Sequence, residues 1–135
     1  PGIGARFREI QEMTRALAVL GVEFEKKNPV TSLMTDTEKG LLREDILNEK
    51  VLSAIVEVKV GLEQAPKILK AVREVSRRLT TVVAVGVSTR CDETGEDGRL
   101  GALLAAEGYR PYRGKTNLGL GRMTVGSGTG AGSRR

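Results

Sequence analysis

The chain has 135 residues, of which 39% are hydrophobic and 29% charged, and its formal net charge is +5. It contains no histidine and a single cysteine, Cys91, which excludes histidine-based catalysis, histidine metal sites and an internal disulfide. This length suits one domain with its own core, and no apolar run approaches the roughly 18 residues of a membrane span. The first residues lack the pattern of a signal peptide, so the sequence predicts a cytoplasmic protein without membrane contact. Few amide side chains among many charges are typical of a thermophilic source.

The first predicted element is an amphipathic helix over residues 4–20. Its apolar side chains recur at the period of one helix face; they are Phe7, Ile10, Met13, Leu17 and Leu20. Gly21 ends this helix. Residues 22–25 alternate like a short strand, and the lysines and proline of residues 26–29 are typical of a sheet border. Residues 30–34 fit either a loop or a strand.

A second helix is predicted after residue 38. Thr35 and Glu38 have the spacing of a capping box, in which each side chain accepts a hydrogen bond from a free backbone donor at a helix start. The apolar residues between positions 41 and 51 fit this helix loosely, although Gly40 lowers the helix propensity.

The centre of the predicted fold is a strand, a helix and a strand within residues 53–89. Residues 53–60 alternate, with the even-numbered apolar side chains on one buried face. Residues 62–79 carry an apolar stripe at helical spacing, and Pro66 is tolerated in the first turn. Residues 81–87 are almost all apolar and β-branched, which is typical of a strand covered on both faces.

Short connections between these elements favour a right-handed parallel βαβ crossover. A ferredoxin-like split βαβ arrangement, with a third strand between the two, is the alternative. The sequence therefore predicts an α/β fold: a single three- to five-stranded mixed sheet with helices packed on it.

The carboxyl-terminal part changes character along its length. Residues 99–107 predict a short helix that Gly108 ends, and residues 118–125 fit a last, irregular strand. Residues 126–135 form a Gly/Ser-rich basic tail, which is a flexible linker by composition. The predicted organisation is one α/β domain over residues 1–125 followed by this tail.

All of the excess positive charge lies in the last 28 residues. The first 107 residues hold 16 basic and 17 acidic residues, and no acidic residue follows Glu107. Cations that neutralise phosphates and aromatic rings that stack on bases are typical of polyanion binding. The segment therefore predicts binding of RNA or another phosphate-rich polyanion by Tyr109, Arg110, Tyr112, Arg113, Lys115 and Arg122. Docking on an acidic protein partner and a merely solubilising tail are the alternatives.

The predicted helix over residues 62–79 carries further cations: Lys67, Lys70, Arg73, Arg77 and Arg78. They could extend the polyanion site. Glu63 and Glu74 lie four residues before Lys67 and Arg78, however, and this spacing favours ordinary salt bridges on a solvated face.

The loop of residues 88–98 is the second candidate site, because ligands in such folds bind beyond the carboxyl ends of strands. As a small-ligand site it would use Ser88, Thr89, Arg90 and Asp92, and a metal ion would be held by Asp92 and Asp97. Acidic residues before a helix also stabilise its amino terminus, and this structural interpretation is the favoured one. Cys91 fits a bystander thiol better than an activated one.

Three function classes follow. The favoured one is a non-catalytic, polyanion-binding module that needs no cofactor and has no catalytic residue. The second is a small enzyme or a regulatory subunit that binds a phosphorylated or metal-bound ligand at residues 88–98. The third is a subunit of a homo-oligomer, in which the apolar stripe of the first helix pairs between copies, although a core-facing helix explains this stripe better.

Overall fold

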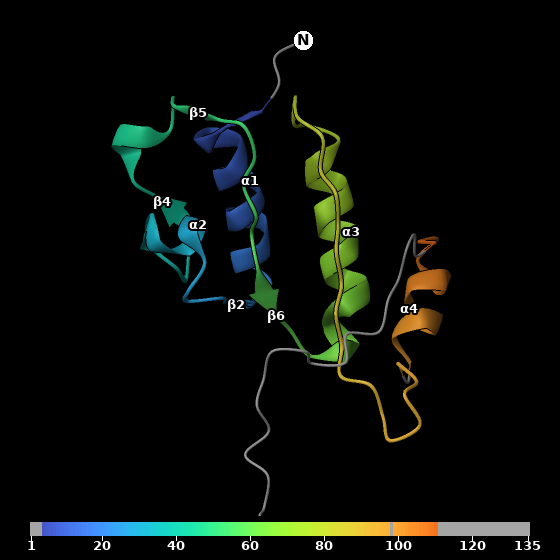
Figure 1. Ribbon diagram of the computed structural model, residues 1–135. Helices are drawn as coiled ribbons and strands as arrows, with labels where there is room; N and C mark the ends of the chain where they lie inside the picture. Colours follow the sequence, from blue (N-terminus) through green and yellow to red (C-terminus); the bar gives the residue numbers. More distant parts are fainter. Residues whose placement is uncertain (1–3, 98, 111–135) are drawn as a thin grey trace, which may run out of the picture.

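A computed structural model of the chain describes residues 4–97 and 99–110 (Figure 1). The helices are α1 (Phe7–Ala18), α2 (Pro29–Ser32), α3 (Ala65–Ser76) and α4 (Leu100–Ala106), with the 3-10 turns η1 (Glu44–Ile46) and η2 (Leu62–Gln64). The strands are β1 (Ala5–Arg6), β2 (Glu23–Phe24), β3 (Met34–Asp36), β4 (Leu41–Leu42), β5 (Lys50–Val51) and β6 (Val58–Lys59). No helix of this part of the chain is long and apolar enough to cross a bilayer.

The strands form three small antiparallel sheets of two strands each. β1 pairs with β5, β2 with β6, and β3 with β4. The mixed α/β class is confirmed. The single three- to five-stranded sheet and the ferredoxin-like variant are not confirmed and stay predictions, because no sheet within the described residues has a third strand.

Helix α1 confirms the first predicted element and lies between two apolar clusters. Phe7 and Ile10 pack in the first cluster with Val30, Leu42 and Ile46. Met13 and Leu17, one and two turns further on, pack in the second. Four residues of the predicted stripe are therefore internal, because the exposed fractions of Phe7, Ile10, Met13 and Leu17 are all 8% or less. The fifth, Leu20, lies beyond the end of α1 and is half-buried.

Helices α1 and α3 run antiparallel to each other, and α4 packs on a further side of α3 (Figure 1). The second cluster joins α1 to α3 through Ile68 and Val75, and Phe24 of β2 closes it. A third cluster joins α3 to α4 through Leu69, Leu100 and Leu104. Both predicted helices are confirmed, and the positive φ of Gly108 ends α4 as expected.

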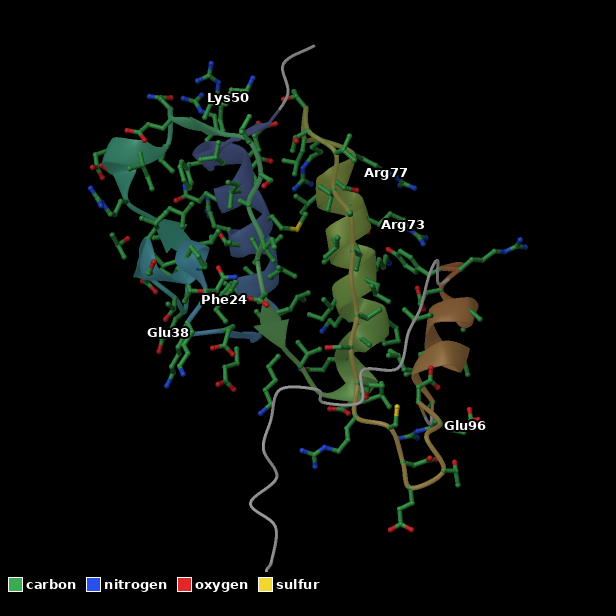
Figure 2. All side chains as sticks on the ribbon, viewed as in Figure 1. Phe24, Glu38, Lys50, Arg73, Arg77 and Glu96 are labelled. Atoms are coloured by element: carbon green, nitrogen blue, oxygen red, sulfur yellow. The ribbon has the colours of Figure 1, made fainter. Side chains whose placement is uncertain are left out.

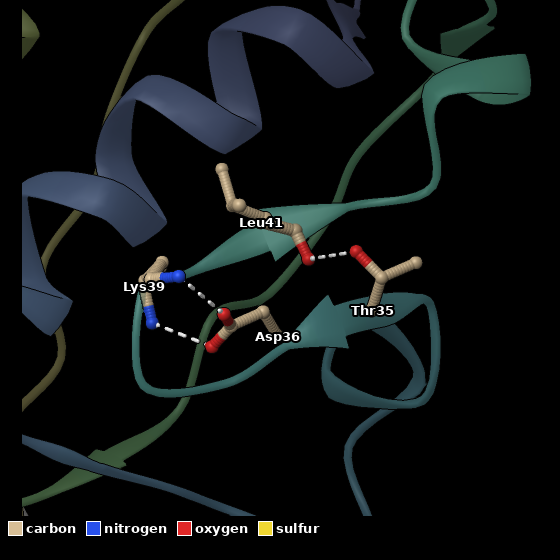
Figure 3. Close-up of polar contacts among 4 residues, drawn as sticks. All are labelled: Thr35, Asp36, Lys39 and Leu41. Atoms are coloured by element: carbon tan, nitrogen blue, oxygen red, sulfur yellow. Dashed lines mark hydrogen bonds and ion pairs between the residues drawn. The ribbon is translucent and has the colours of Figure 1, made fainter.

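The predicted helix after residue 38 is wrong: residues 34–42 form a β-hairpin instead. In Figure 3, Asp36 accepts a hydrogen bond from the Lys39 backbone N–H at 3.0 Å and forms an ion pair with its side chain at 3.4 Å. The Thr35 hydroxyl donates to the carbonyl of Leu41 across the strands at 3.4 Å, so it caps no helix. Gly40 has a φ of +65°, which turns the chain back into β4.

Two polar side chains of α1 hold this hairpin in place. Thr14 is fully buried and its hydroxyl donates to the carbonyl of Gly40 at 2.7 Å. The side-chain oxygen of Gln11 accepts from the Leu42 backbone N–H at 2.8 Å. The hairpin therefore packs against α1, and Leu42 becomes one of the most buried residues of the first cluster.

The chain path of the predicted central unit is present, but its two predicted strands do not pair with each other. Residues 52–60 and residues 80–90 are extended, and both run opposite in direction to α3 (Figure 1). Val56, Val58 and Val83 pack on the second cluster, as the predicted inward faces require. Residues 81–87 nevertheless form no strand, because their backbone groups find no partner among the described residues.

Candidate anion-binding groove

The predicted polyanion-binding segment lies mostly outside the described residues. Tyr109 and Arg110 are described, whereas Tyr112, Arg113, Lys115 and Arg122 are not. The geometry therefore shows where the basic segment begins, on the side of α3 that faces α4.

Tyr109 anchors the start of this segment on α3. Its hydroxyl donates to the carbonyl of Leu69 at 3.1 Å, and its ring packs on the third cluster. The guanidinium carbon of Arg73 lies 4.5 Å from the centroid of this ring, and Arg73 also donates to the carbonyl of Glu107 at 2.8 Å. These contacts engage the ring that the sequence offered for base stacking. Arg110, next in the chain, is exposed.

The salt bridges expected along α3 do not form. Between described residues the ion pairs are Lys39 with Asp36 and Arg43 with Asp45. All 17 acidic residues of the chain lie within the described ranges. No carboxylate side chain therefore lies within 4.0 Å of the exposed cations of α3 and its end, Lys67, Lys70, Arg77 and Arg78. Figure 2 shows Arg73 and Arg77 projecting from one side of the helix.

A groove runs along α1 where this helix lies beside the chain at the end of α3. It consists of two adjoining hollows of about 260 and 410 Å³, which share Glu12 and Arg78 as lining residues. We call this the cationic groove, because five basic side chains line it: Arg6, Arg8, Arg15, Lys50 and Arg78. Lys50 marks the β5 end of this region in Figure 2.

The carboxylates of Glu9 and Glu12 also line the groove beside these five cations. Glu9 accepts hydrogen bonds from the backbone N–H and the hydroxyl of Thr80, at 2.8 and 2.7 Å, and from the Arg6 backbone N–H at 3.0 Å. These bonds, the Thr80 hydroxyl foremost, hold the pKa of Glu9 below its usual range. Glu9 therefore fixes the groove wall in its ionised form, and the groove keeps an excess of positive charge.

The chemistry of this arrangement is electrostatic. Arg8 and Arg78 are exposed, and no carboxylate lies within ion-pair distance of either. Arg6 is partly engaged, because its guanidinium donates to the carbonyl of Asn48 at 2.5 Å. Guanidinium groups in such a setting bind phosphate oxygens in a bidentate manner. Across the described part of the chain, no three acidic or cysteine side chains converge as a metal site would require.

In the loop of residues 88–98, a carboxylate proposed as a ligand accepts hydrogen bonds from within the loop itself. Oδ1 of Asp92 accepts from the backbone N–H groups of Thr94 and Glu96, at 2.9 and 3.0 Å, and from the Thr94 hydroxyl at 2.7 Å. These bonds lower the pKa of Asp92 and close the turn. Ser88, Thr89, Arg90 and Asp97 are exposed. Cys91 is half-buried and free.

Most of the cationic groove was missed by reasoning from sequence. Arg78 is among the cations that the sequence pattern places on α3, whereas no sequence pattern singles out Arg6, Arg8 or Lys50. Arg6 and Arg8 lie more than 40 positions before Lys50 in the chain, and the antiparallel pairing of Arg6 with Lys50 brings the three together. No local pattern carries that information.

Comparisons with known protein families, with characterised proteins and with solved structures found no match to this chain. The function is therefore argued from the geometry and the charges alone.

Proposed function

We propose that the protein is a non-catalytic cytoplasmic module that binds RNA or another phosphate-rich polyanion through its basic carboxyl-terminal segment. Arg110, Arg113, Lys115 and Arg122 would neutralise phosphates, and Tyr112 would stack on unpaired bases. The observation that carries this proposal is the absence of any ion pair between a carboxylate and the cations of α3, the cationic groove or Arg110 in the described part of the chain.

An ion pair with a carboxylate would weaken the contribution of a cation to phosphate binding. A carboxylate within 4 Å would cancel the field of a cation and hold its side chain away from an incoming phosphate. The two carboxylates that do form ion pairs, Asp36 and Asp45, lie on the hairpin and on η1. Apart from Arg6 and Arg73, which donate to backbone carbonyls, the cations of α3 and of the groove remain available to phosphates. The carboxyl-terminal segment adds cations without adding acids.

Tyr109 has a distinct role in this proposal. Its ring and hydroxyl are engaged by Arg73 and Leu69, so it anchors the segment while Arg110 and the residues after it bind. The alternative of a small-ligand site at residues 88–98 has weaker support, because the Asp92 carboxylate is engaged in its own turn.

The test compares the full chain with a variant in which Arg110, Arg113, Lys115 and Arg122 are all changed to Gln. Binding of a fluorescent single-stranded RNA is measured by anisotropy at several salt concentrations. We expect a steep loss of affinity with rising salt for the full chain, because neutralised phosphates release counterions. The variant should bind at least tenfold more weakly at low salt.

The matched control removes the same number of charges elsewhere, by changing Lys26, Lys27, Lys59 and Arg99, all exposed, to Gln. This control distinguishes an effect of where the charges lie from an effect of the net charge alone. Equal affinity of the two variants, or no binding of RNA and of a polyphosphate chain by the full protein at low salt, contradicts the proposal.

A further inference from the structure

A long uncharged stretch follows the end of α3 and forms the extended segment after it. Residues 79–89 contain no charged residue, in a chain that is 29% charged. Five of these eleven residues are apolar with a β-branched or long aliphatic side chain: Leu79, Val82, Val83, Val85 and Val87. Such a composition is typical of a strand that is covered on both faces.

The described part of the chain does not cover it. Val82 is 93% exposed, Val85 44% and Val87 51%. From residue 81 to residue 91 no backbone N–H or carbonyl forms a hydrogen bond with another described residue. The segment therefore offers both open backbone edges and exposed valines.

This segment is held in place at its start. The Thr80 backbone N–H and hydroxyl both donate to Glu9, and Leu79 and Val83 pack on the second cluster. Its position relative to α1 and α3 is thus fixed by the body of the protein. An extended segment fixed in this way can receive a strand at a lower entropic cost than a loose loop.

We propose that a second copy of this chain pairs with this segment, forming a dimer in which residues 81–87 of the two copies lie antiparallel about a twofold axis. The charge and the geometry of the segment both favour a copy of the chain as the partner. Natural edge strands prevent self-pairing with lysines, prolines or bulges, and residues 79–89 contain no lysine and no proline. The stretch meets its own copy without any like-charge repulsion.

Twofold pairing also matches the side chains. A twofold axis perpendicular to the new sheet places residues of the same face opposite each other. An axis through Val85 sets Val85 opposite its own copy and Val83 opposite Val87. Pairs of β-branched side chains in these positions stabilise an antiparallel ladder. Val85 and Val87, which the body of one chain leaves exposed, gain cover from the second chain.

The test measures mass by light scattering on the nuclease-treated full chain, over a range of protein concentrations. We expect twice the monomer mass of 14.5 kDa. The first variant, Val85→Lys, places two lysines against each other at the axis. The second, Ala84→Pro with Val85→Pro, removes one N–H from each edge of the segment, since successive N–H groups point to opposite edges.

The control is Val19→Lys, because Val19 is 85% exposed at the end of α1 and takes no part in the proposed pairing. Monomeric Val85 and proline variants beside a dimeric Val19 variant support the proposal, provided that all melt cooperatively. A full chain that stays at 14.5 kDa at every protein concentration overturns the proposal. This holds even if another segment of the chain or a foreign strand covers the valines. Variants at Val85 that stay dimeric, or a Val19 variant that dissociates, overturn it as well. The outcome is independent of polyanion binding.

Discussion

The carboxylate of Glu9 accepts two hydrogen bonds from Thr80, a residue 71 positions later in the chain. Glu9 lies in the first turn of α1, and Thr80 lies just beyond the end of α3. The contact thus joins the two main helices at the cationic groove and sets the direction in which residues 81–87 leave. One side chain therefore influences the fold, the groove and the proposed dimer edge.

This contact predicts a pH-dependent stability. Because the hydrogen bonds lower the pKa of Glu9, the ionised carboxylate stabilises the fold above its ordinary pKa, and this stabilisation is lost as the pH falls through the lowered value. Glu9→Gln should cost about 1 kcal/mol at neutral pH, since the site is partly exposed. The difference from wild type should shrink between about pH 6 and about pH 3 in urea unfolding. Glu12→Gln, on the same helix, is the control, and an equal pH trend in both variants contradicts the prediction.

Gly40 predicts a large effect of a small substitution. Its φ is +65°, and a Cβ at this position would overlap the carbonyl of Thr14, which belongs to the backbone of α1. Gly40→Ala should therefore destabilise the protein by roughly 2–4 kcal/mol, from the strained backbone and the overlap together. Gly21→Ala is the matched control, because φ is +71° there but no atom lies within 4 Å of the Cβ position. It should cost only about 1–2 kcal/mol. Equal losses of unfolding free energy would contradict the packing argument.

The periodic helices could be predicted from the sequence, whereas the hairpin could not. The three- and four-residue spacing in α1, α3 and α4 reflects burial on one side, which the structure confirms at Leu17, Leu69 and Leu104. The spacing of Thr35 and Glu38 fits a helix capping box as well as it fits a turn. The tertiary contact of Gly40 with Thr14 decides between the two, and it joins residues 26 positions apart.

The predicted strand over residues 81–87 has no pairing partner among the described residues, for a related reason. Alternation identifies which face of a segment is buried, and Val56, Val58 and Val83 do face the second cluster. It does not identify the segment that supplies hydrogen bonds, which is why residues 81–87 read as a central strand. The groove cations Arg6 and Lys50 could not be brought together from sequence either, because only the β1–β5 register places them side by side.

Tyr109 should act on stability more than on polyanion affinity. Tyr109→Phe removes the hydrogen bond to the carbonyl of Leu69 and should cost about 1 kcal/mol of unfolding free energy. The ring remains stacked on Arg73. The RNA affinity at each salt concentration should therefore stay within about twofold of wild type, which is well below the tenfold change that about 1.4 kcal/mol of binding free energy would give. Arg73→Lys, which keeps the charge but loses the stacked guanidinium, should lower stability in the same direction. A Tyr109→Phe protein of wild-type stability but weaker RNA binding would assign the hydroxyl to the ligand instead.

The cationic groove should contribute to the salt dependence of polyanion binding. Arg8 and Arg78 are exposed and form no ion pair with a carboxylate, so each can neutralise one phosphate. For a single-stranded ligand, each lost contact should reduce the slope of log affinity against log salt by about 0.7. The double change Arg8→Gln with Arg78→Gln is measured by RNA anisotropy against Arg43→Gln, because Arg43 is already paired with Asp45. An unchanged slope in the double variant, beside full loss of binding on removing the carboxyl-terminal cations, would confine the polyanion site to residues 110–122.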